Sequence, residues 1–448
     1  MRKVVTRIAP SPTGWMHLGT ARTAIFAYLY AKRHGGEFKI RIEDTDKARS
    51  TIEYQNDILE GLDWLGLDYD GDIVFQSERI DRHREVIDSC LDAKVAYKCY
   101  LTADEAAGLK VQGKAFRSPY RDSDVVEDRP YTVRFKVPDT QIVVVDEVRG
   151  TVHFDSNTLD DLVLMRSDGN PTYNLVVAVD DHDMGVTHVI RGDDHLANTP
   201  KQQLIYEAMG WEVPTWAHLP LIHNEKGQKM SKRHGDAANL SDLAADGYPA
   251  DGVFNYLCRL GWGKDTMELF TREEVQEVFD LSNIVKSPAR FDSKKLRNTC
   301  EWHFRRLPKD DVINYAIAKY PNLVRSAVET AYDCYASEAA ATLDEFSKSV
   351  ANTACLTGPT INAPPTKNVE FTYQEILDIC GSIPKNIKDP KAVTSYIRDI
   401  LKNKNVSMGA FGQAFRAYFY GGSPSPDFGS CILTIREQHP TIFVSTTD

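Results

Sequence analysis

The chain has 448 residues, of which 42% are hydrophobic and 26% charged, values typical of a soluble globular protein with several domains. It has no apolar run of membrane-spanning length and no signal-peptide core at its start, so we expect a cytoplasmic protein without a membrane partner. Eight scattered cysteines without a Cys-x-x-Cys pair argue against a disulfide framework, and the net charge of −11 argues against a nucleic-acid partner unless basic residues cluster locally.

The first informative segment runs from Arg7 to Thr20, with the sequence RIAPSPTGWMHLGT. An apolar run before a Pro/Ser/Gly turn, followed by apolar residues at helical spacing, predicts a strand, a tight loop and the start of a helix. A helix start presents free N–H groups and the positive end of its dipole to an anion. His17 can donate hydrogen bonds to a triphosphate, and Gly19 lets the backbone approach it closely. No Gly-Lys-Ser/Thr follows, so this is not a Walker loop, and an ordinary strand–turn–helix is the alternative.

Strand and helix patterns alternate up to about residue 95, with a strand expected at 37–42 and a helix at 51–65. This alternation predicts half of a nucleotide-binding, doubly wound parallel sheet. From about residue 96 the pattern becomes strand-like, which we interpret as an α+β insertion between the halves of the sheet. The strands expected in the insertion cover 131–137, 142–145 and 151–154.

The sheet is expected to resume with strands at 173–179 and 186–191. It ends near a second informative segment, KMSKR at 229–233, which lies between Gly227 and Gly235 and is therefore predicted to be a mobile loop. Two lysines in such a loop can close over phosphates and neutralise the charge that builds as pyrophosphate leaves. A solvated basic surface is the more ordinary explanation when this segment is considered alone.

From about residue 240 the patterns are mostly helical. A linker is expected at 357–366, which holds three prolines and no charged residue. Two stretches are locally basic: 290–310 has seven Lys or Arg against three Asp or Glu, and 385–404 has six against two. Such stretches can follow a phosphate backbone, although a solvated helix face is the alternative.

Together, the two informative segments resemble the His-x-Gly-His/Thr and Lys-Met-Ser-Lys-Ser signatures of class I aminoacyl-tRNA synthetases. The sequence around them, RIAPSPTG at 7–14 and RIEDTD at 41–46, is similar to that of bacterial glutamyl-tRNA synthetases, closely up to about residue 300 and more loosely beyond. The resemblance implies a Rossmann-type doubly wound parallel sheet with an α+β insertion, followed by α-helical C-terminal domains. The implied parts are the first half of the catalytic domain (1–95), an acceptor-binding insertion (96–170), the second half with the lysine loop (171–240), a helical stem-contact domain (241–305) and a helical anticodon-binding domain (306–448).

The resemblance also implies the ATP-dependent attachment of glutamate to tRNA. The α-carboxylate of glutamate would attack the α-phosphorus of ATP and release pyrophosphate, and the terminal ribose hydroxyl of tRNA(Glu) would then attack the carbonyl of glutamyl-adenylate. No side-chain nucleophile is needed, so catalysis depends on positioning and on electrostatic stabilisation of the phosphates. We expect a monomer that uses ATP with Mg2+, the ion having few protein ligands. The implied catalytic residues are His17, Gly19, Lys229 and Lys232, and the implied ATP contacts are Pro12, Thr13, Gly14, His17, Gly19, Thr20, Met230, Ser231 and Lys232.

The glutamate site can be argued from charge. An enzyme that rejects glutamine needs a fixed cation at the γ position, because a guanidinium donates two hydrogen bonds to a carboxylate but meets the NH2 of an amide donor to donor. Arg7 and Arg191 each end an expected strand, where ligands bind in this architecture, and both match positions that the family uses for glutamate. The resemblance adds Tyr173 for the side-chain carboxylate, and charge and position add Glu43 for the ammonium and Ser11 for the α-group. Surface caps or ion pairs are the alternative for each of them.

Zinc is not expected. Some relatives hold zinc in the insertion through a Cys-x-Cys and a later pair of ligands. Here Cys99 is followed by Tyr100 and Leu101, and no cysteine occurs again until Cys258, so four ligands cannot be assembled there.

The sequence also bears on the choice of tRNA. Relatives strict for glutamate tRNA have an arginine near the start of the anticodon domain that opposes the first base of the glutamine anticodon. The segment 337–343 that aligns there, SEAAATL, has no arginine, so our hypothesis is an enzyme relaxed toward tRNA(Gln) or directed to it. The alternatives are a glutaminyl-tRNA synthetase and a non-catalytic tRNA-binding paralogue, although the latter would be expected to have lost His17, Lys232 or Arg191.

Overall fold

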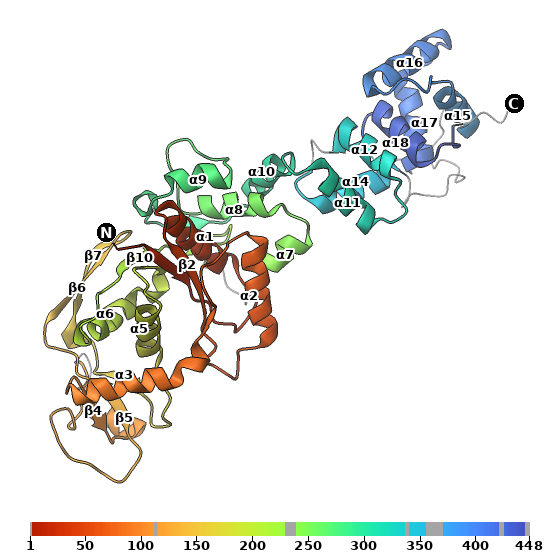
Figure 1. The fold of residues 1–448 in the computed structure, drawn as a ribbon. Coiled ribbons are helices and arrows are strands. Elements are labelled where there is room, and N and C mark those ends of the chain that lie inside the picture. The colour runs from red at the N-terminus through yellow and green to blue at the C-terminus, as the bar shows by residue number, and fades with distance from the viewer. Residues whose placement is uncertain are drawn as a thin grey trace. The chain divides into compact units, whose positions relative to one another are not determined.

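The computed structural model describes residues 2–111, 114–228, 239–336, 340–354, 371–420 and 425–443 (Figure 1). Contacts between residues divide the chain into two compact units. The first contains Met1–Asp242 and Phe254–Asp292, and the second contains Leu243–Val253 and Ser293–Asp448. Within the described residues, all strands belong to the first unit, and the elements of the second are helices.

The first three strands form a parallel sheet in the order β1-β2-β3. They are β1 (Val5–Ile8), β2 (Glu37–Ile42) and β3 (Val74–Phe75), and α1 (Leu18–Arg33) and α2 (Ile52–Trp64) connect them. The predicted alternation of strand and helix is confirmed, and the strand expected at 37–42 has the predicted bounds. Gly35 follows the end of α1 with a φ of +60°, a conformation that favours glycine and stops the helix before β2.

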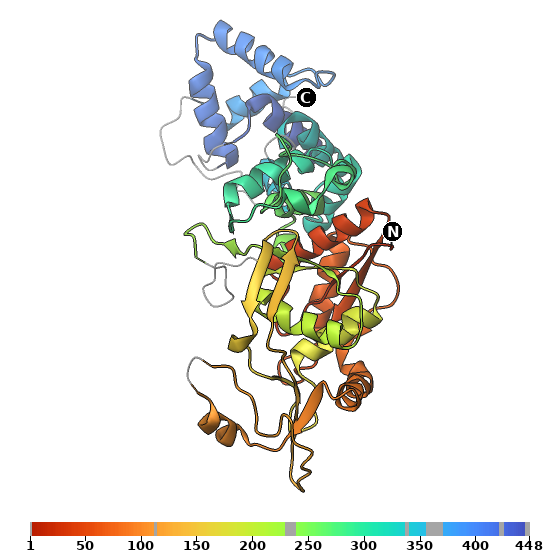
Figure 2. The same ribbon diagram turned by 90° about the vertical axis from the view of Figure 1, so that its left-hand side faces the viewer.

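A second sheet has the strand order β7-β6-β10-β9. Its strands are β6 (Gln141–Asp146), β7 (Gly150–Asp155), β9 (His188–Gly192) and β10 (Thr215–Leu219). β9 and β10 are parallel, and β6 joins β10 where Asp146 pairs with Trp216. β6 and β7 form an antiparallel hairpin, visible as two adjacent yellow arrows in Figure 2. This hairpin, which belongs to the segment expected as an insertion, therefore extends the sheet that carries β9.

The segment 173–179 is helical, so the strand predicted there was wrong. Helix α5 covers Tyr173–Asp183, and every residue from Leu175 to Asp181 is buried. A short apolar run that is buried on all sides has the same pattern in a strand and in a helix, so periodicity cannot distinguish the two. α5 packs beside α6 (Thr199–Ala208).

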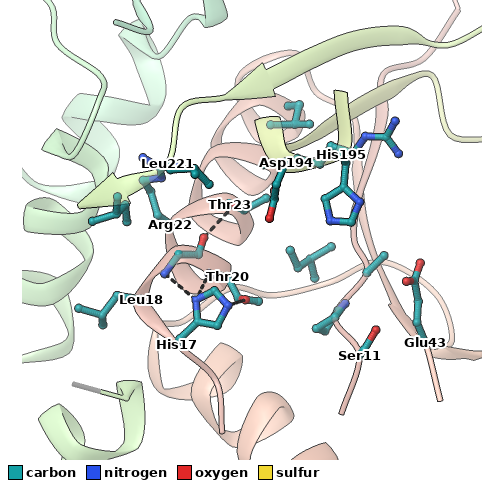
Figure 3. Close-up of a pocket in the computed structure, with 18 of the residues that line it drawn as sticks. Ser11, His17, Leu18, Thr20, Arg22, Thr23, Glu43, Asp194, His195 and Leu221 are labelled. Carbon is teal, nitrogen blue, oxygen red and sulfur yellow. Dashed lines mark hydrogen bonds between the residues drawn. The ribbon is translucent and has the colours of Figure 1, made fainter. Parts of the chain in front are cut away.

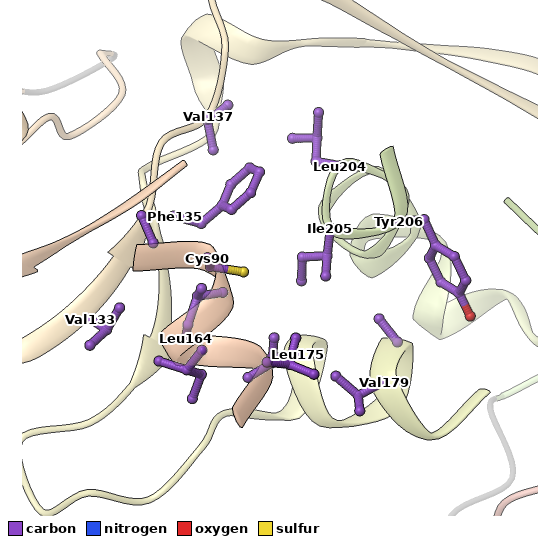
Figure 4. Close-up of a cluster of buried hydrophobic side chains, with 14 of the residues drawn as sticks. Cys90, Val133, Phe135, Val137, Leu164, Leu175, Val179, Leu204, Ile205 and Tyr206 are labelled. Carbon is purple, nitrogen blue, oxygen red and sulfur yellow. The ribbon is translucent and has the colours of Figure 1, made fainter. Parts of the chain in front are cut away.

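The third sheet is antiparallel, with the order β4-β5-β8. Its strands are β4 (Ala96–Cys99), β5 (Thr132–Phe135) and β8 (Leu162–Met165), with α3 (Ile80–Asp92) before β4 and α4 (Ala103–Leu109) after it. One apolar core joins this sheet to α3, α5 and α6, and Phe135, Leu164, Leu175 and Ile205 are buried in it (Figure 4). The shared core fixes the helix that begins at Tyr173.

The described residues from 239 onward are mostly helical, as predicted, apart from a two-residue strand that pairs with the strand before the lysine loop. These strands are β11 (Ile222–His223) and β12 (Ala289–Arg290), and the helices are α7 (Leu240–Ala245), α8 (Ala250–Arg259), α9 (Arg272–Val278), α10 (Ser293–Phe304), α11 (Lys309–Lys319), α12 (Arg325–Ala331), α14 (Leu343–Thr353), α15 (Tyr373–Gly381), α16 (Pro390–Asn403), α17 (Met408–Tyr420) and α18 (Phe428–Gln438). Within the second unit, α18 packs against α12 and α16. The linker expected at 357–366 lies outside the described residues. Of the helices in the described part of the chain, none is long and apolar enough to cross a bilayer.

Candidate active site

A cavity of about 480 Å³ lies where the carboxyl ends of β1, β2 and β9 meet the starts of α1 and α5. β9 lies beside β1, and just before it Thr187 N donates to Val5 O at 2.9 Å. This is the edge of a doubly wound sheet at which ligands bind. Eight of the predicted site residues line the cavity, namely Arg7, Ser11, His17, Gly19, Thr20, Glu43, Tyr173 and Arg191.

The cavity separates two groups of predicted contacts. In Figure 3, Ser11 and Glu43 lie on one side of the view, and His17 and Thr20 lie on the other. The first group was predicted to bind the amino acid and the second to bind phosphates. The structure therefore brings members of both groups to one cavity, with these two pairs apart in this view.

The other predicted contacts do not line this cavity. Pro12, Thr13 and Gly14 belong to the turn between β1 and α1, and they are not among the lining residues. The lysine loop lies outside the described residues, so the positions predicted for Lys229, Met230, Ser231 and Lys232 stay predictions.

His17 caps the helix that it precedes. Its Nδ1 accepts from the backbone N–H groups of Gly19 and Thr20 at 3.1 and 3.3 Å, and its Nε2 lies 3.2 Å from Thr20 Oγ1. Since Nδ1 accepts, the neutral ring carries its proton on Nε2. A Cβ at position 19 would lie 3.0 Å from two ring atoms, so glycine there makes room for the imidazole. A phosphate at this helix start would have to share these N–H groups with His17.

Arg7 is held by a row of ion pairs. Its Nε and Nη2 donate to the two carboxylate oxygens of Asp181 at 2.9 and 3.2 Å. The same carboxylate accepts from Nη1 of the fully buried Arg41 at 2.5 Å, and Arg41 Nη2 donates to Glu43 Oε1 at 3.0 Å. Burial alone raises the pKa of the Asp181 carboxyl, but the charges of Arg41 and Arg7 outweigh it and bring the pKa to about 2. Two arginines thus face two carboxylates, which compensates their buried charge.

Arg191 is also buried, but no carboxylate among the described residues pairs with it. Its Nε donates to His218 Nε2 at 3.1 Å, Nη1 donates to Gln202 Oε1 at 2.8 Å, and Nη2 donates to Thr199 Oγ1 at 2.8 Å. Burial lowers the pKa of Arg191 to about 10, so the guanidinium stays charged at neutral pH. A buried cation with neutral partners favours an anion in the cavity that it lines.

With this geometry established, comparison with known proteins identifies the family. Residues 3–298 match the family described as tRNA synthetases class I (E and Q), catalytic domain. The chain belongs to this family. The membership confirms the predicted family and the predicted class of fold.

Curated relatives of this class I tRNA synthetase include two proteins named glutamate–tRNA ligase. One, from Cereibacter sphaeroides, is 54% identical over 311 residues, which are 67% of this chain and 66% of the relative. Another, from Ruegeria pomeroyi, is 53% identical over 327 residues, which are 71% of this chain and 69% of the relative. The match to the first thus spans slightly less than two thirds of that relative's length.

A solved structure is similar over nearly the whole chain. It is a glutamate tRNA ligase from Elizabethkingia meningosepticum in complex with its amino acid, with a TM-score of 0.82 and 27% sequence identity. The similarity covers 98% of this chain and 99% of that one. The second unit is therefore part of the shared fold.

Sequence reasoning missed several polar residues at and next to this cavity. His195 lines the cavity, and its Nδ1 lies 2.8 Å from Tyr173 OH. Burial raises the pKa of Tyr173 to about 12. Arg22 also lines it and donates to Leu260 O at 3.1 Å. The only sequence signal for Arg22 or Asp181 is a charged residue inside an apolar pattern, which shows burial but names no partner.

Proposed function

We propose that this chain is a glutamate–tRNA ligase, which activates glutamate with ATP as glutamyl-adenylate and transfers it to tRNA(Glu). The observation that carries the proposal is the charge of the cavity: Asp181 pairs with Arg7, whereas the described partners of Arg191 are all neutral. The excess positive charge suits an acidic amino acid better than its amide. The curated relatives named glutamate–tRNA ligase support the same assignment.

The roles of the residues follow from the two groups of contacts. Arg191 and Tyr173 bind the side-chain carboxylate of glutamate, Glu43 attracts its ammonium, and Arg7 and Ser11 complete this end. His17, Gly19 and Thr20 hold the phosphates at the start of α1, with Pro12, Thr13 and Gly14 beside the nucleotide. Met230, Ser231, Lys232 and Lys229 approach the phosphates from the lysine loop, and Mg2+ accompanies the ATP.

The domain roles are part of the same proposal. The segment 96–170 receives the acceptor end of tRNA, 241–305 contacts its stem and 306–448 binds the anticodon, while 1–95 and 171–240 form the catalytic domain. The antiparallel sheet at 96–165 and the helices from 239 onward support this division. We further propose a cytoplasmic monomer without structural zinc. The cysteines of the described residues form no disulfide, which supports a reducing compartment.

Pyrophosphate exchange into ATP, measured with tRNA present, tests the activity. We expect exchange with glutamate and at least about tenfold to thousandfold less with glutamine, because one or two charge-assisted hydrogen bonds of about 1.5–3 kcal/mol each separate the two amino acids. Lys232→Ala should lose most of this exchange and still bind glutamate in equilibrium dialysis. Near-normal exchange in that variant would refute the role of Lys232. Exchange with glutamine alone would indicate a glutaminyl-tRNA synthetase, and none with either would indicate a non-catalytic relative.

We also propose that the enzyme accepts tRNA(Gln). In the described part of the segment that lacks an arginine, Ala340 and Ala341 are buried, and Thr342 caps α14 by accepting from Glu345 N at 3.0 Å. These side chains offer no cation to oppose a base. Charging assays on the two purified tRNAs should give glutamyl-tRNA from both, and failure to charge tRNA(Gln) would dispose of the idea.

A further inference from the structure

Arg191, which lines the cavity, is held by side chains that do not line it. Each terminal nitrogen of Arg191 carries two N–H groups, and one from each is used by Gln202 or Thr199. The remaining pair can be offered to a carboxylate as two parallel hydrogen bonds. The direction of that pair depends on what holds the guanidinium, and its Nε is held by His218 Nε2 at 3.1 Å.

His218 is itself fixed by a buried carboxylate. Its Nδ1 lies 2.5 Å from Asp146 Oδ2, and both side chains are fully buried. A carboxylate accepts hydrogen bonds but does not donate them, so the ring proton sits on Nδ1 and Nε2 is left as an acceptor. That acceptor faces two donors, Arg191 Nε and, at 2.9 Å, Thr199 Oγ1. Burial lowers the pKa of His218, which keeps the imidazole neutral and the acceptor available.

Asp146 is also fixed by its surroundings. It ends β6, where it pairs with Trp216 of β10, and its Oδ1 accepts from the backbone N–H groups of Val148 and Arg149 at 2.9 and 2.7 Å. These bonds turn the chain from β6 into β7, and Oδ2 faces the imidazole and also accepts from the backbone N–H of His218 at 3.1 Å. The hairpin between the halves of the catalytic sheet thus supplies Asp146, the last member of the hydrogen-bonded relay Asp146–His218–Arg191.

We propose that Asp146 and His218 are positioning residues for Arg191: the carboxylate selects the imidazole tautomer, and the imidazole fixes the plane of the guanidinium that reads the acidic substrate. This inference rests on the proposed function, in which Arg191 binds the side chain of glutamate. Asp146 and His218 do not line the cavity, but the inference gives them a part in the selection of the amino acid.

An isosteric variant tests the relay. In Asp146→Asn, the amide oxygen should stay at the Oδ1 position, where two backbone N–H groups donate, so its NH2 faces His218 Nδ1. The imidazole must then carry its proton on Nε2, where this N–H donor would face the Nε–H donor of Arg191. We expect the KM for glutamate in pyrophosphate exchange to rise about tenfold to a hundredfold, the loss of one charged hydrogen bond, with the KM for ATP changed less than about twofold.

The tautomer is read directly from the nitrogen-15 chemical shifts of His218, assigned by the signals missing in His218→Gln. Protonation on Nδ1 in the wild type and on Nε2 in Asp146→Asn is expected, and the same tautomer in both would overturn the proposal. Asp160→Asn is the matched control, because Asp160 also accepts from a backbone N–H, that of Phe116 at 2.7 Å, but belongs to another network. It should change neither the KM for glutamate nor the tautomer.

Two amides at position 218 keep the proposal testable if Asp146→Asn does not fold. The oxygen of His218→Gln reaches the place of Nε2 and can accept from Arg191, whereas the amide of His218→Asn reaches only the place of Nδ1 and Asp146. In His218→Gln, we expect the KM for glutamate to stay within about threefold of the wild-type value. In His218→Asn, we expect it to rise at least about tenfold. Equal values in the two folded variants would overturn the proposal. If the wild type shows no exchange with glutamate, the proposed function fails, while the tautomer measurement still decides whether the relay exists.

Discussion

Arg191→Ala should raise the KM for glutamate by about a hundredfold to ten-thousandfold and leave the KM for ATP nearly unchanged. The variant loses two hydrogen bonds to the substrate carboxylate, at about 1.5–3 kcal/mol each, and about 1.4 kcal/mol corresponds to a factor of ten. It should also bring the values of kcat/KM for glutamate and glutamine closer together, since the group that tells a carboxylate from an amide is gone. Pyrophosphate exchange measured with each amino acid gives both quantities.

Lysine should not restore the function. The three nitrogens of Arg191 bond to three different neighbours, whereas one ammonium cannot occupy these positions and also offer two parallel N–H groups to a ligand. Arg191→Lys is therefore expected to lose at least about tenfold in kcat/KM. Arg82→Ala is the control, because Arg82 is a half-exposed arginine whose partners are Asp183 and Glu85. An unchanged KM for glutamate in Arg191→Ala would contradict the assignment of the site.

The local part of this site could be predicted from the sequence. The strand, turn and helix around His17 are determined by residues that are neighbours in the sequence, and the bounds of β2 follow from its residue pattern. The network behind the site could not be predicted, because Asp146, Arg191 and His218 lie on three different strands. Sequence spacing carries no information on which buried polar groups meet across a sheet. The error at 173–179 has a related cause, since a fully buried helix shows no polar face.

Arg7 and Arg191, two of the arginines that line the cavity, have different tasks. Both oxygens of Asp181 accept from Arg7, and one of them, Oδ1, also accepts from Arg41, so this row is held together by its own charges. Arg191 has neutral neighbours that hold it without cancelling its charge. The first arrangement makes a rigid wall, and the second leaves a cation for the ligand. Substitutions in the row should therefore affect stability first, and those at Arg191 should affect binding first.

Asp181→Asn should lower the free energy of unfolding by about 3–5 kcal/mol at neutral pH, because it leaves two buried guanidiniums with the single carboxylate of Glu43. The folded pKa of Asp181, about 2, is below its usual value of 3.8, so its contribution is present above the usual pKa and is lost as the pH falls toward 2. The difference between wild type and variant should therefore narrow from about pH 5 downward. Urea unfolding at pH 7 and at about pH 3 measures both effects. Asp183→Asn, on the same helix and paired with the partly exposed Arg79 and Arg82, should cost less than about 1 kcal/mol. An equal loss in the two variants would show that the buried row has no special part in stability.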